Sequence, residues 1–317
     1  MSLLEFRSFR NHDVPVIAEL WNSAELGRGA VIMHGTDELD FFVLSQPHFD
    51  RHGLILAFVD GQPAGFVHAG FGVGSNRTTV DSTTGVICAL VVHPAFRGRG
   101  IGRALVQQAE SYLLSHGAQV LLAGPADPFN PYWSGLYGGS EASGFLESDV
   151  LAKPFFTSLG YRPQSMIGVF QRVIGQRDPI NVRLMRVRRS TELRLLEDPV
   201  PHDFWTLTNR GRLETARLGL VLKKQELPVG WVTICGLDMY SSKWQQRAIG
   251  LHGIHVAPEH RRQGYGQALL CDVSKQLKDD QVDLMEAHAN MEDPAAMAVL
   301  ISSGFQLIDT GIVYRKA

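Results

Sequence analysis

The sequence has few cysteines, little net charge and no long apolar run, and each absence narrows the class of protein. Its three cysteines, Cys88, Cys235 and Cys271, lack the spacing of a zinc site or a disulfide framework. Their apolar surroundings predict buried, reduced thiols, and we expect no bound metal. The 30 basic residues are balanced by 32 acidic ones, so the chain lacks the basic surplus typical of nucleic-acid-binding proteins.

The sequence also shows no sign of a targeting or membrane segment. Its first residues, MSLLEFRSFRNHD, resemble neither a secretory signal nor a transit peptide. No apolar run approaches the length of a membrane span. We therefore expect a cytoplasmic protein without a membrane partner, and its 317 residues suit two domains of ordinary size.

A glycine-rich turn is present twice. Residues 91–106 read VVHPAFRGRGIGRALV: a strand end, a proline turn, alternating arginine and glycine, and then apolar residues at helical spacing. Residues 254–269, IHVAPEHRRQGYGQAL, repeat this order. Arg261 follows Arg97 by 164 positions, close to half of the chain. Such a repeat is typical of a duplicated module.

Each turn is a candidate anion site. The first N–H groups of a helix have no intrahelical partner, the helix dipole adds positive potential, and glycine lets a phosphate approach the backbone. Arg97, Arg99 and Arg103 add positive charge at the first turn. A surface turn that uses glycine for conformation and arginine for solubility would explain one copy, but a duplicated site explains both.

The repeated residues carry a family resemblance. Arg-x-x-Gly-x-Gly after a strand and Val-x-Pro resembles the acetyl-CoA-binding motif of the GNAT N-acetyltransferase superfamily. The plan is similar to that of the tandem, two-domain members, which include mycothiol synthase. The resemblance implies an α/β fold with two domains, residues 1–175 and 181–317, each a mixed, partly parallel, splayed sheet flanked by helices. We expect a strand over 164–174 to close the first half, and a strand over 182–189 to begin the second.

The resemblance also implies the donor, acetyl-CoA. In GNAT domains the turn holds the pyrophosphate, and the strand before the turn pairs with the pantetheine arm. The implied cofactor-binding residues of the first half are Leu90, Val91, Val92, Arg97, Gly98, Arg99, Gly100, Ile101, Gly102 and Arg103. Those of the second half are Ile254, His255, Val256, Arg261, Arg262, Gln263, Gly264, Tyr265, Gly266 and Gln267.

An amine acceptor is protonated at neutral pH, so its acetylation needs a base. Where many GNATs carry a glutamate, this sequence has Cys88 and His252. A histidine titrates near ~6.5, which favours His252, although a hydrogen-bonded histidine packed on the sheet is an equal interpretation. Glu141 is a further candidate, as a base or as a carboxylate that binds the amine. Strand alternation turns His93 and His255 towards other faces.

The general acid of many GNATs is missing. Those proteins carry a tyrosine that protonates the leaving thiolate, and the matching positions here are Phe156 and Leu300. Neither side chain can give a proton. Because a coenzyme A thiolate leaves without strong help, the loss lowers activity without excluding it. Tyr137, Tyr161 and Tyr314 are candidate substitutes.

Residues 124–148 form an insertion rich in glycine, proline and aromatic residues, which predicts a long functional loop. We interpret it as part of the acceptor pocket, with Tyr132, Trp133 and Tyr137 binding substrate. A packing lid and a domain-contact loop are the alternatives. The insertion favours a catalytic site in the first half, whereas His252 favours the second.

The leading hypothesis is an acetyl-CoA-dependent N-acetyltransferase that acts on a primary amine of a small molecule or peptide. The amine attacks directly in a ternary complex, so most of the rate comes from orientation and deprotonation. The altered base and acid positions also suit a non-catalytic protein that binds or senses acyl-CoA. The turns lie outside low-complexity sequence, which argues against RNA binding. A monomer and a homodimer are both compatible with the sequence.

Overall fold

A computed structural model describes residues 3–74, 76–179, 181–197, 203–211, 213–224 and 227–317. The first half contains seven strands and four α-helices among these residues. In chain order they are β1 (Leu4–Ser8), α1 (Val14–Ser23), α2 (Asp37–Leu39), β2 (Leu54–Val59), β3 (Gln62–Val73), β4 (Val80–Val92), α3 (Ile101–Ser115), β5 (Val120–Ala123), β6 (Phe145–Leu146), α4 (Ala152–Ser158) and β7 (Tyr161–Val173).

The second half repeats the hairpin, the strand–turn–helix unit and the closing strands of this order, but it begins with an additional helix. In chain order its elements are α5 (Val182–Ser190), β8 (Thr191–Leu196), α6 (Phe204–Arg210), β9 (Thr215–Leu222), β10 (Pro228–Gly236), α7 (Ser241–Trp244), β11 (Ala248–Val256), α8 (Tyr265–Asp279), β12 (Leu284–Asn290), α9 (Pro294–Ser302) and β13 (Gln306–Lys316). Short 3-10 turns lie at Asn11–Asp13, Pro94–Phe96, Asp238–Tyr240 and Pro258–His260, and a π-helical turn lies at Asp40–Leu44.

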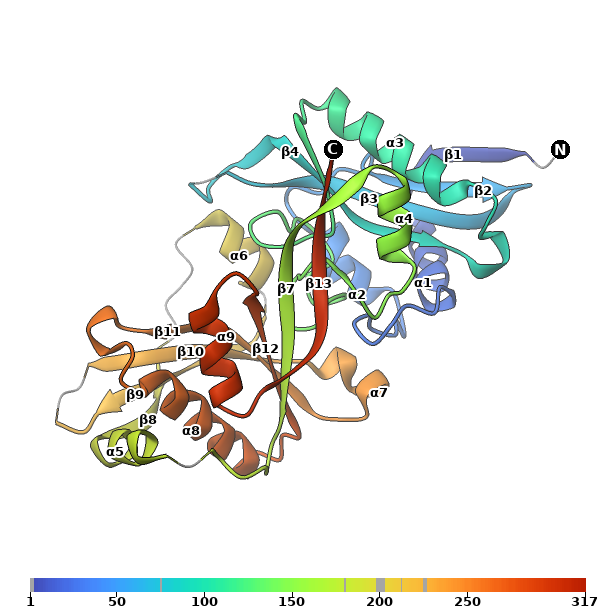
Figure 1. Cartoon of the computed structure of the whole chain (residues 1–317). Coiled ribbons are helices and arrows are strands. Elements are labelled where there is room, and N and C mark those ends of the chain that lie inside the picture. The colour runs from blue at the N-terminus through green and yellow to red at the C-terminus, as the bar shows by residue number, and fades with distance from the viewer. Residues whose placement is uncertain (1–2, 75, 180, 198–202, 212, 225–226) are drawn as a thin grey trace.

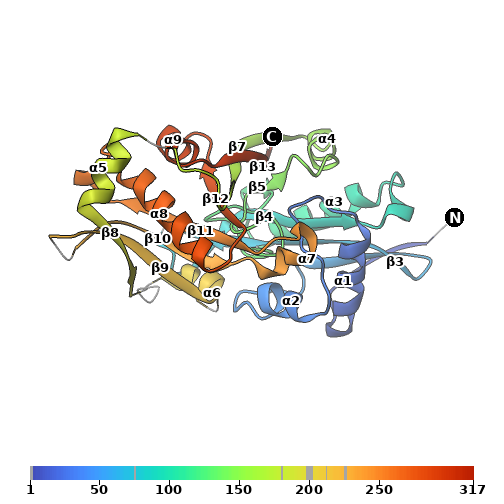
Figure 2. The same cartoon turned by 90° about the horizontal axis from the view of Figure 1, so that it is seen from below.

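The described strands form one mixed sheet, which confirms the predicted fold class. Its order is β1-β2-β3-β4-β5-β13-β7-β12-β11-β10-β9-β8, and β6 pairs with β13. In each half a helix, α3 or α8, crosses between two parallel strands. Figure 2 shows α3, α4, α8 and α9 on one face of the sheet and α1, α2 and α6 on the other. No helix of the described residues is long and apolar enough to cross a membrane.

The two halves exchange their last strands at the centre of the sheet. β13 pairs with β5 of the first half, where Tyr314 lies opposite Ala123, and also with β7. β7 pairs in turn with β12 of the second half, where Gln171 lies opposite Glu286. Figure 1 shows β7 and β13 side by side between the halves. The prediction that strand 164–174 closes the first half is therefore wrong, because the strand next to β5 comes from the end of the chain.

The second half begins with a helix, whereas the sequence predicted a strand over 182–189. The side chain of Asn181 caps α5 by accepting a hydrogen bond from the N–H of Leu184, at 2.7 Å. Leu184 and Val187, three residues apart, are both buried, so they share one face of a helix. The cap and the apolar spacing therefore favour a helix over residues 182–189. The edge strand of the second half is β8, which follows this helix.

Both parallel pairs separate before the glycine turns, so the sheet is splayed in each half. β4 pairs with β5 through Ile87, and β11 pairs with β12 through Leu251. Both leading strands continue beyond these points. The first residues after the pairing ends are Cys88 and His252, at equivalent places in the two halves. The sequence alignment of these two positions is thereby confirmed.

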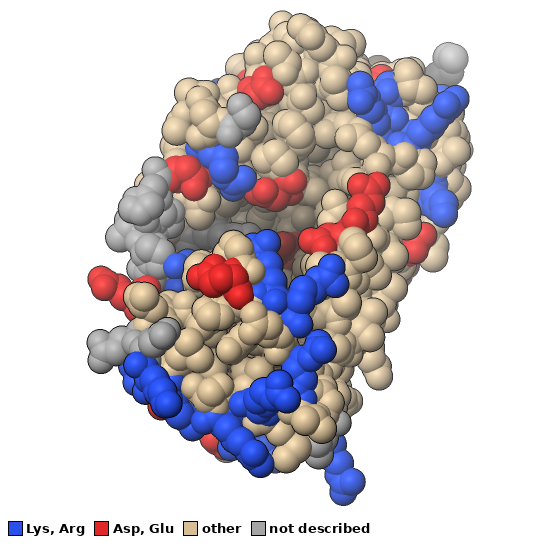
Figure 3. Space-filling model, turned by 60° about the vertical axis from the view of Figure 1, so that its left-hand side comes forward, with Lys and Arg blue, Asp and Glu red and all other residues tan. Residues whose placement is uncertain are grey.

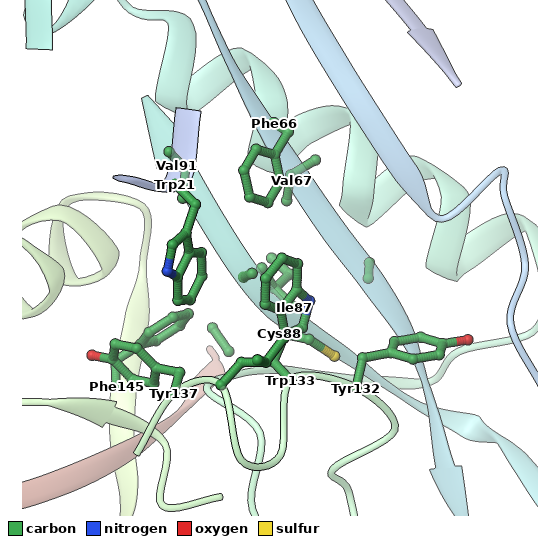
Figure 4. Packing of buried hydrophobic residues seen from close by; sticks show 14 of the residues in the cluster. Trp21, Phe66, Val67, Ile87, Cys88, Val91, Tyr132, Trp133, Tyr137 and Phe145 are labelled. Atoms are coloured by element: carbon green, nitrogen blue, oxygen red, sulfur yellow. The ribbon is translucent and has the colours of Figure 1, made fainter. Parts of the chain in front are cut away.

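The aromatic rings of the insertion lie in the hydrophobic core. Tyr132, Trp133 and Tyr137 are 2%, 1% and 8% exposed. The Trp133 ring stacks on Trp21 with 4.8 Å between ring centroids, and Figure 4 shows this packing above Cys88. The expectation that these three rings line an acceptor pocket is therefore wrong, because core residues already cover them.

Candidate functional site

The tip of the insertion reaches into the second half and places Glu141 there. The N–H of Gly139 donates to the hydroxyl of Tyr240 at 3.0 Å. Gly139 has a φ of 94°, and a β-carbon there would collide with the carboxylate of Glu286, so glycine is required. The N–H of Ser140 donates to that carboxylate at 2.8 Å. The insertion is thus a domain contact, one of the alternatives left open by the sequence.

Glu141 contacts His252, and His252 contacts Cys235. Oε1 of Glu141 lies 3.0 Å from Nδ1 of His252, and Nε2 of His252 lies 2.9 Å from Sγ of Cys235. His252 is 3% exposed on β11, and Cys235 is 6% exposed on β10. The side chain of Glu141 is 30% exposed. The three groups therefore form a chain from an accessible carboxylate to a buried thiol.

The surroundings of His252 change its protonation. Burial opposes its charged form, but hydrogen bonds to Cys235 and Glu141, together with the charge of Glu141, outweigh burial and raise its pKa to about 9. His252 is then protonated at neutral pH, in contrast to the ordinary value assumed from the sequence. The Glu141–His252 pair therefore gains its capacity to accept a proton as the pH rises through about 9.

Three cavities connect this cluster with the second glycine turn. A cavity of about 890 Å³ is lined by Arg261, Gly264, Gly266 and Ile254. The next, of about 420 Å³, shares Ile254 and extends past the point where β11 and β12 separate to Glu141. The third, of about 70 Å³, contains Glu141, His252 and Cys235. Figure 3 shows a hollow between the two halves with acidic side chains at its edge.

The second glycine turn has the geometry of an anion site. Gly264, the N-cap of the fifteen-residue helix α8, has a φ of 95°, a conformation that suits glycine. Nε of Arg261 donates to the carbonyl of Val256 at 2.9 Å, which holds the start of the turn against the end of β11. The free N–H groups of the first turn of α8 thus face the largest of the three cavities.

The equivalent position in the first half is closed. Cys88 is 3% exposed, and its thiol donates to the carbonyl of Val86 at 3.5 Å. Burial raises the pKa of the Cys88 thiol, so it stays protonated at neutral pH. The aromatic rings of the insertion pack over it (Figure 4). The structure thus gives Cys88 a packing role, whereas His252 and Glu141 lie together at a cavity.

The remaining candidates are engaged elsewhere. His255 stacks on Trp231, with 4.2 Å between ring centroids. Nδ1 of His93 accepts a hydrogen bond from the N–H of Ala95 at 3.2 Å. The position Phe156 is buried in the core of the first half, whereas Leu300 lines the middle cavity. The three tyrosines considered as substitute acids are all buried: Tyr137, Tyr161 and Tyr314.

Sequence reasoning missed Cys235 and His288. Cys235 lies in an apolar strand and reads as a core residue, and only the register of β10 on β11 brings it to His252. His288 follows Glu286 by two residues on β12, so the two share one face of the sheet. The register of the β10–β11 hairpin could have indicated Cys235. The polar residues Glu286 and His288, two positions apart in a mainly apolar strand, could have indicated His288.

The fold and the site define a duplicated α/β domain with a glycine turn at a helix N-terminus in each copy. The profile of the Acetyltransferase (GNAT) family matches residues 18–137 and 185–305, which together exceed half of the chain. The chain therefore belongs to the GNAT acetyltransferase family, as a tandem, two-domain member.

Solved structures share this fold over almost the whole chain. One is a tandem GNAT protein from the clavulanic acid biosynthesis pathway, with a TM-score of 0.64 and 18% identity over 99% of this chain and 98% of that chain. Another is a GCN5-related N-acetyltransferase from Sphaerobacter thermophilus, with a TM-score of 0.61 and 18% identity over 99% and 95% of the two chains. At this identity the likeness shows the fold.

Proposed function

We propose that this protein transfers an acetyl group from acetyl-CoA to a primary amine of a small molecule or peptide, and that the second half carries the reaction. The observation behind the proposal is the series of cavities that joins the glycine turn before α8 to the Glu141–His252 pair. The donor enters from the turn and the amine from the Glu141 end. The sequence favoured the first half, but its equivalent position, Cys88, is buried under the insertion.

The residues at the turn fit the donor substrate. Backbone N–H groups at the start of α8 suit the pyrophosphate, and Arg261 and Arg262 add positive charge beside it. The part of β11 beyond the end of its pairing, which includes Ile254, has a free edge for the pantetheine arm. When bound, acetyl-CoA supplies a thioester carbonyl that an amine can attack.

The Glu141–His252 pair can take the proton that the amine must lose. The Glu141 carboxylate lines two of the cavities, so it can receive the proton of the amine. The carboxyl group can then pass a proton to Nδ1 of His252 in the tautomer whose ring proton lies on Nε2, towards Sγ of Cys235. The neutral amine nitrogen then bonds to the acetyl carbon while the carbon–sulfur bond breaks. This is direct attack in a ternary complex, without a covalent enzyme intermediate.

The pH dependence of the reaction follows from the pKa of His252. We expect kcat/KM to rise tenfold per pH unit and to level off near pH 9, the pKa of His252. The measurement is release of coenzyme A with a panel that contains an amino sugar, a polyamine, an amino acid and a peptide. Binding of acetyl-CoA without turnover on any amine would favour the non-catalytic sensor instead.

A thiol variant separates the pKa of His252 from that of the amine itself, which lies near ~10. Cys235→Ala removes a hydrogen bond that raises the pKa of His252, so the rising limb of the profile should move to lower pH. Cys271→Ala, which removes another buried thiol, should leave the limb in place. If the rising part of the pH profile is unchanged in Cys235→Ala, it reports the pKa of the amine and not that of His252.

A further inference from the structure

Glu286 is a carboxylate buried on a central strand of the sheet. It lies on β12, between β7 and β11, and its side chain is 0% exposed. Burial opposes the charged form, but hydrogen bonds from His288, Ser140 and Gln171 lower the pKa of Glu286 overall. Glu286 is therefore ionised at neutral pH. A buried charge of this kind is tolerated only with close partners, so the groups around it are held in place.

The partners of Glu286 come mainly from the first half. At the tip of the insertion, the N–H of Ser140 donates to Oε1 at 2.8 Å. Nε2 of Gln171, on β7, donates to Oε2 at 2.6 Å, and Nη2 of Arg28 lies 3.9 Å from Oε2. Nε2 of His288, on β12 itself, lies 3.3 Å from Oε1. A carboxylate of the second half thus gathers groups of the first half around it.

The tip of the insertion is seated against this carboxylate. A β-carbon at Gly139 would collide with Oε1 of Glu286, so the backbone has no room to move closer. Glu141 follows Ser140 directly, so the hydrogen bond of the Ser140 N–H fixes the chain one residue before Glu141. From there Oε1 of Glu141 reaches Nδ1 of His252 at 3.0 Å. The place of Glu141 therefore depends on Glu286.

The first half carries an apolar residue at the equivalent place in its sheet. Glu286 lies opposite Gly250 of β11, and the matching residue, opposite Val86 of β4, is Leu122 of β5. Leu122 is 3% exposed. An apolar side chain thus satisfies the fold at this place, so the carboxylate of Glu286 serves something particular to the second half.

We infer that Glu286 is a positioning residue of acetyl transfer, which holds the tip of the insertion so that Glu141, from the first half, meets His252, in the second. It acts as the hydrogen-bond acceptor of the Ser140 N–H. The two halves therefore build one site, because neither half alone contains the Glu141–His252 pair. This inference rests on the proposed function. If that function fails, the wild type itself releases no coenzyme A with any amine.

Two replacements of Glu286 separate its position from its charge. Glu286→Ala removes the acceptor of the Ser140 N–H, so kcat should fall about 10²-fold, the cost of a misplaced catalytic group, while KM for acetyl-CoA stays the same. Glu286→Gln keeps an amide oxygen for that N–H and should retain most of the activity. The same loss in both variants, or wild-type kcat in a folded Glu286→Ala, overturns the inference.

A double variant tests whether Glu286 acts through Glu141. In the Glu141→Gln background, Glu286→Ala should lower kcat little further, because the base is already lost. A further loss of about 10²-fold contradicts the inference. The matched control is Asp309→Ala. Asp309 is a buried carboxylate that accepts the N–H of Ser148 at 3.2 Å, at the other end of the insertion, and its loss should leave kcat unchanged.

The pKa of His252 provides a readout that needs no substrate. Burial lowers this pKa, whereas hydrogen bonds to Cys235 and Glu141 raise it. NMR titration should therefore find a lower value in Glu286→Ala and a value near 9 in Glu286→Gln. Gly139→Ala displaces the tip from the other side and should lower the value too, which tests the inference if Glu286→Ala does not fold. An unchanged pKa in Glu286→Ala or Gly139→Ala overturns the inference.

Discussion

Replacing Glu141 by glutamine should lower kcat for acetyl transfer by roughly 10²–10⁴-fold, the range associated with general-base catalysis. The amide keeps the size of the side chain but cannot accept the proton of the amine. KM for acetyl-CoA should change little, because the donor is held at the other end of the cavities. The measurement is steady-state release of coenzyme A with a saturating amine.

The matched control is Glu147→Gln, on the same insertion. Glu147 pairs with Lys153 at 3.7 Å on the surface and should be dispensable. His252→Gln should lose about as much as Glu141→Gln, and the double variant little more, because the two residues act as one proton acceptor. Additive losses, or full activity in Glu141→Gln, would contradict the assigned role.

The second large effect concerns the exchanged strands. Residues 1–174 produced alone should not fold cooperatively, because β5 keeps β4 but loses β13, and β7 loses both of its neighbours, β12 and β13. In the whole chain Gln306 of β13 lies opposite Gln171 of β7. A short hairpin turn can therefore join residue 174 to residue 306. The joined fragment should unfold in a single cooperative thermal transition.

The control is the same fragment with residues 306–317 replaced by a glycine–serine segment of equal length. It should behave like residues 1–174 alone. Cooperative unfolding of residues 1–174 without β13 would mean that β7 can close the first half by itself. The exchange would then be unnecessary for stability.

The parts of the fold that follow local chemistry could be predicted from the sequence. The glycine turns need only a strand, glycines that accept a positive φ and a helix start, and all of these are adjacent in the chain. The repeat then aligned Cys88 with His252. The exchange of β7 and β13 could not be predicted, because both are ordinary strands and their choice of partner is a long-range contact.

The candidate site was predicted in part. His252 and Glu141 were separate candidates, and the structure joins them through an insertion that crosses between the halves. The aromatic residues of that insertion suggested a binding loop, but a buried loop must also fill space, and Trp133 does so against Trp21. Local patterns carry no information on which loop residues face a cavity and which face the core.

The alternative to direct attack by the amine is a two-step transfer through an acetylated cysteine. Sγ of Cys235 lies 2.9 Å from Nε2 of His252, so this sulfur is placed beside a base and is the alternative nucleophile for the acetyl group. We expect the protein incubated with acetyl-CoA alone and quenched in acid to carry no acetyl group on the Cys235 peptide. Stoichiometric acetylation of that peptide, released by amine, would replace direct attack with a two-step transfer.

The central claim is that the second half binds and uses acetyl-CoA. The most direct test is kcat/KM for acetyl-CoA in Gly264→Glu and in Gly100→Glu, two equivalent glycines at the N-caps of α8 and α3. Each change places a negative charge where the pyrophosphate would sit. We predict a loss of at least about 100-fold in Gly264→Glu and wild-type activity in Gly100→Glu. The reverse pattern would place the reaction in the first half and contradict the account.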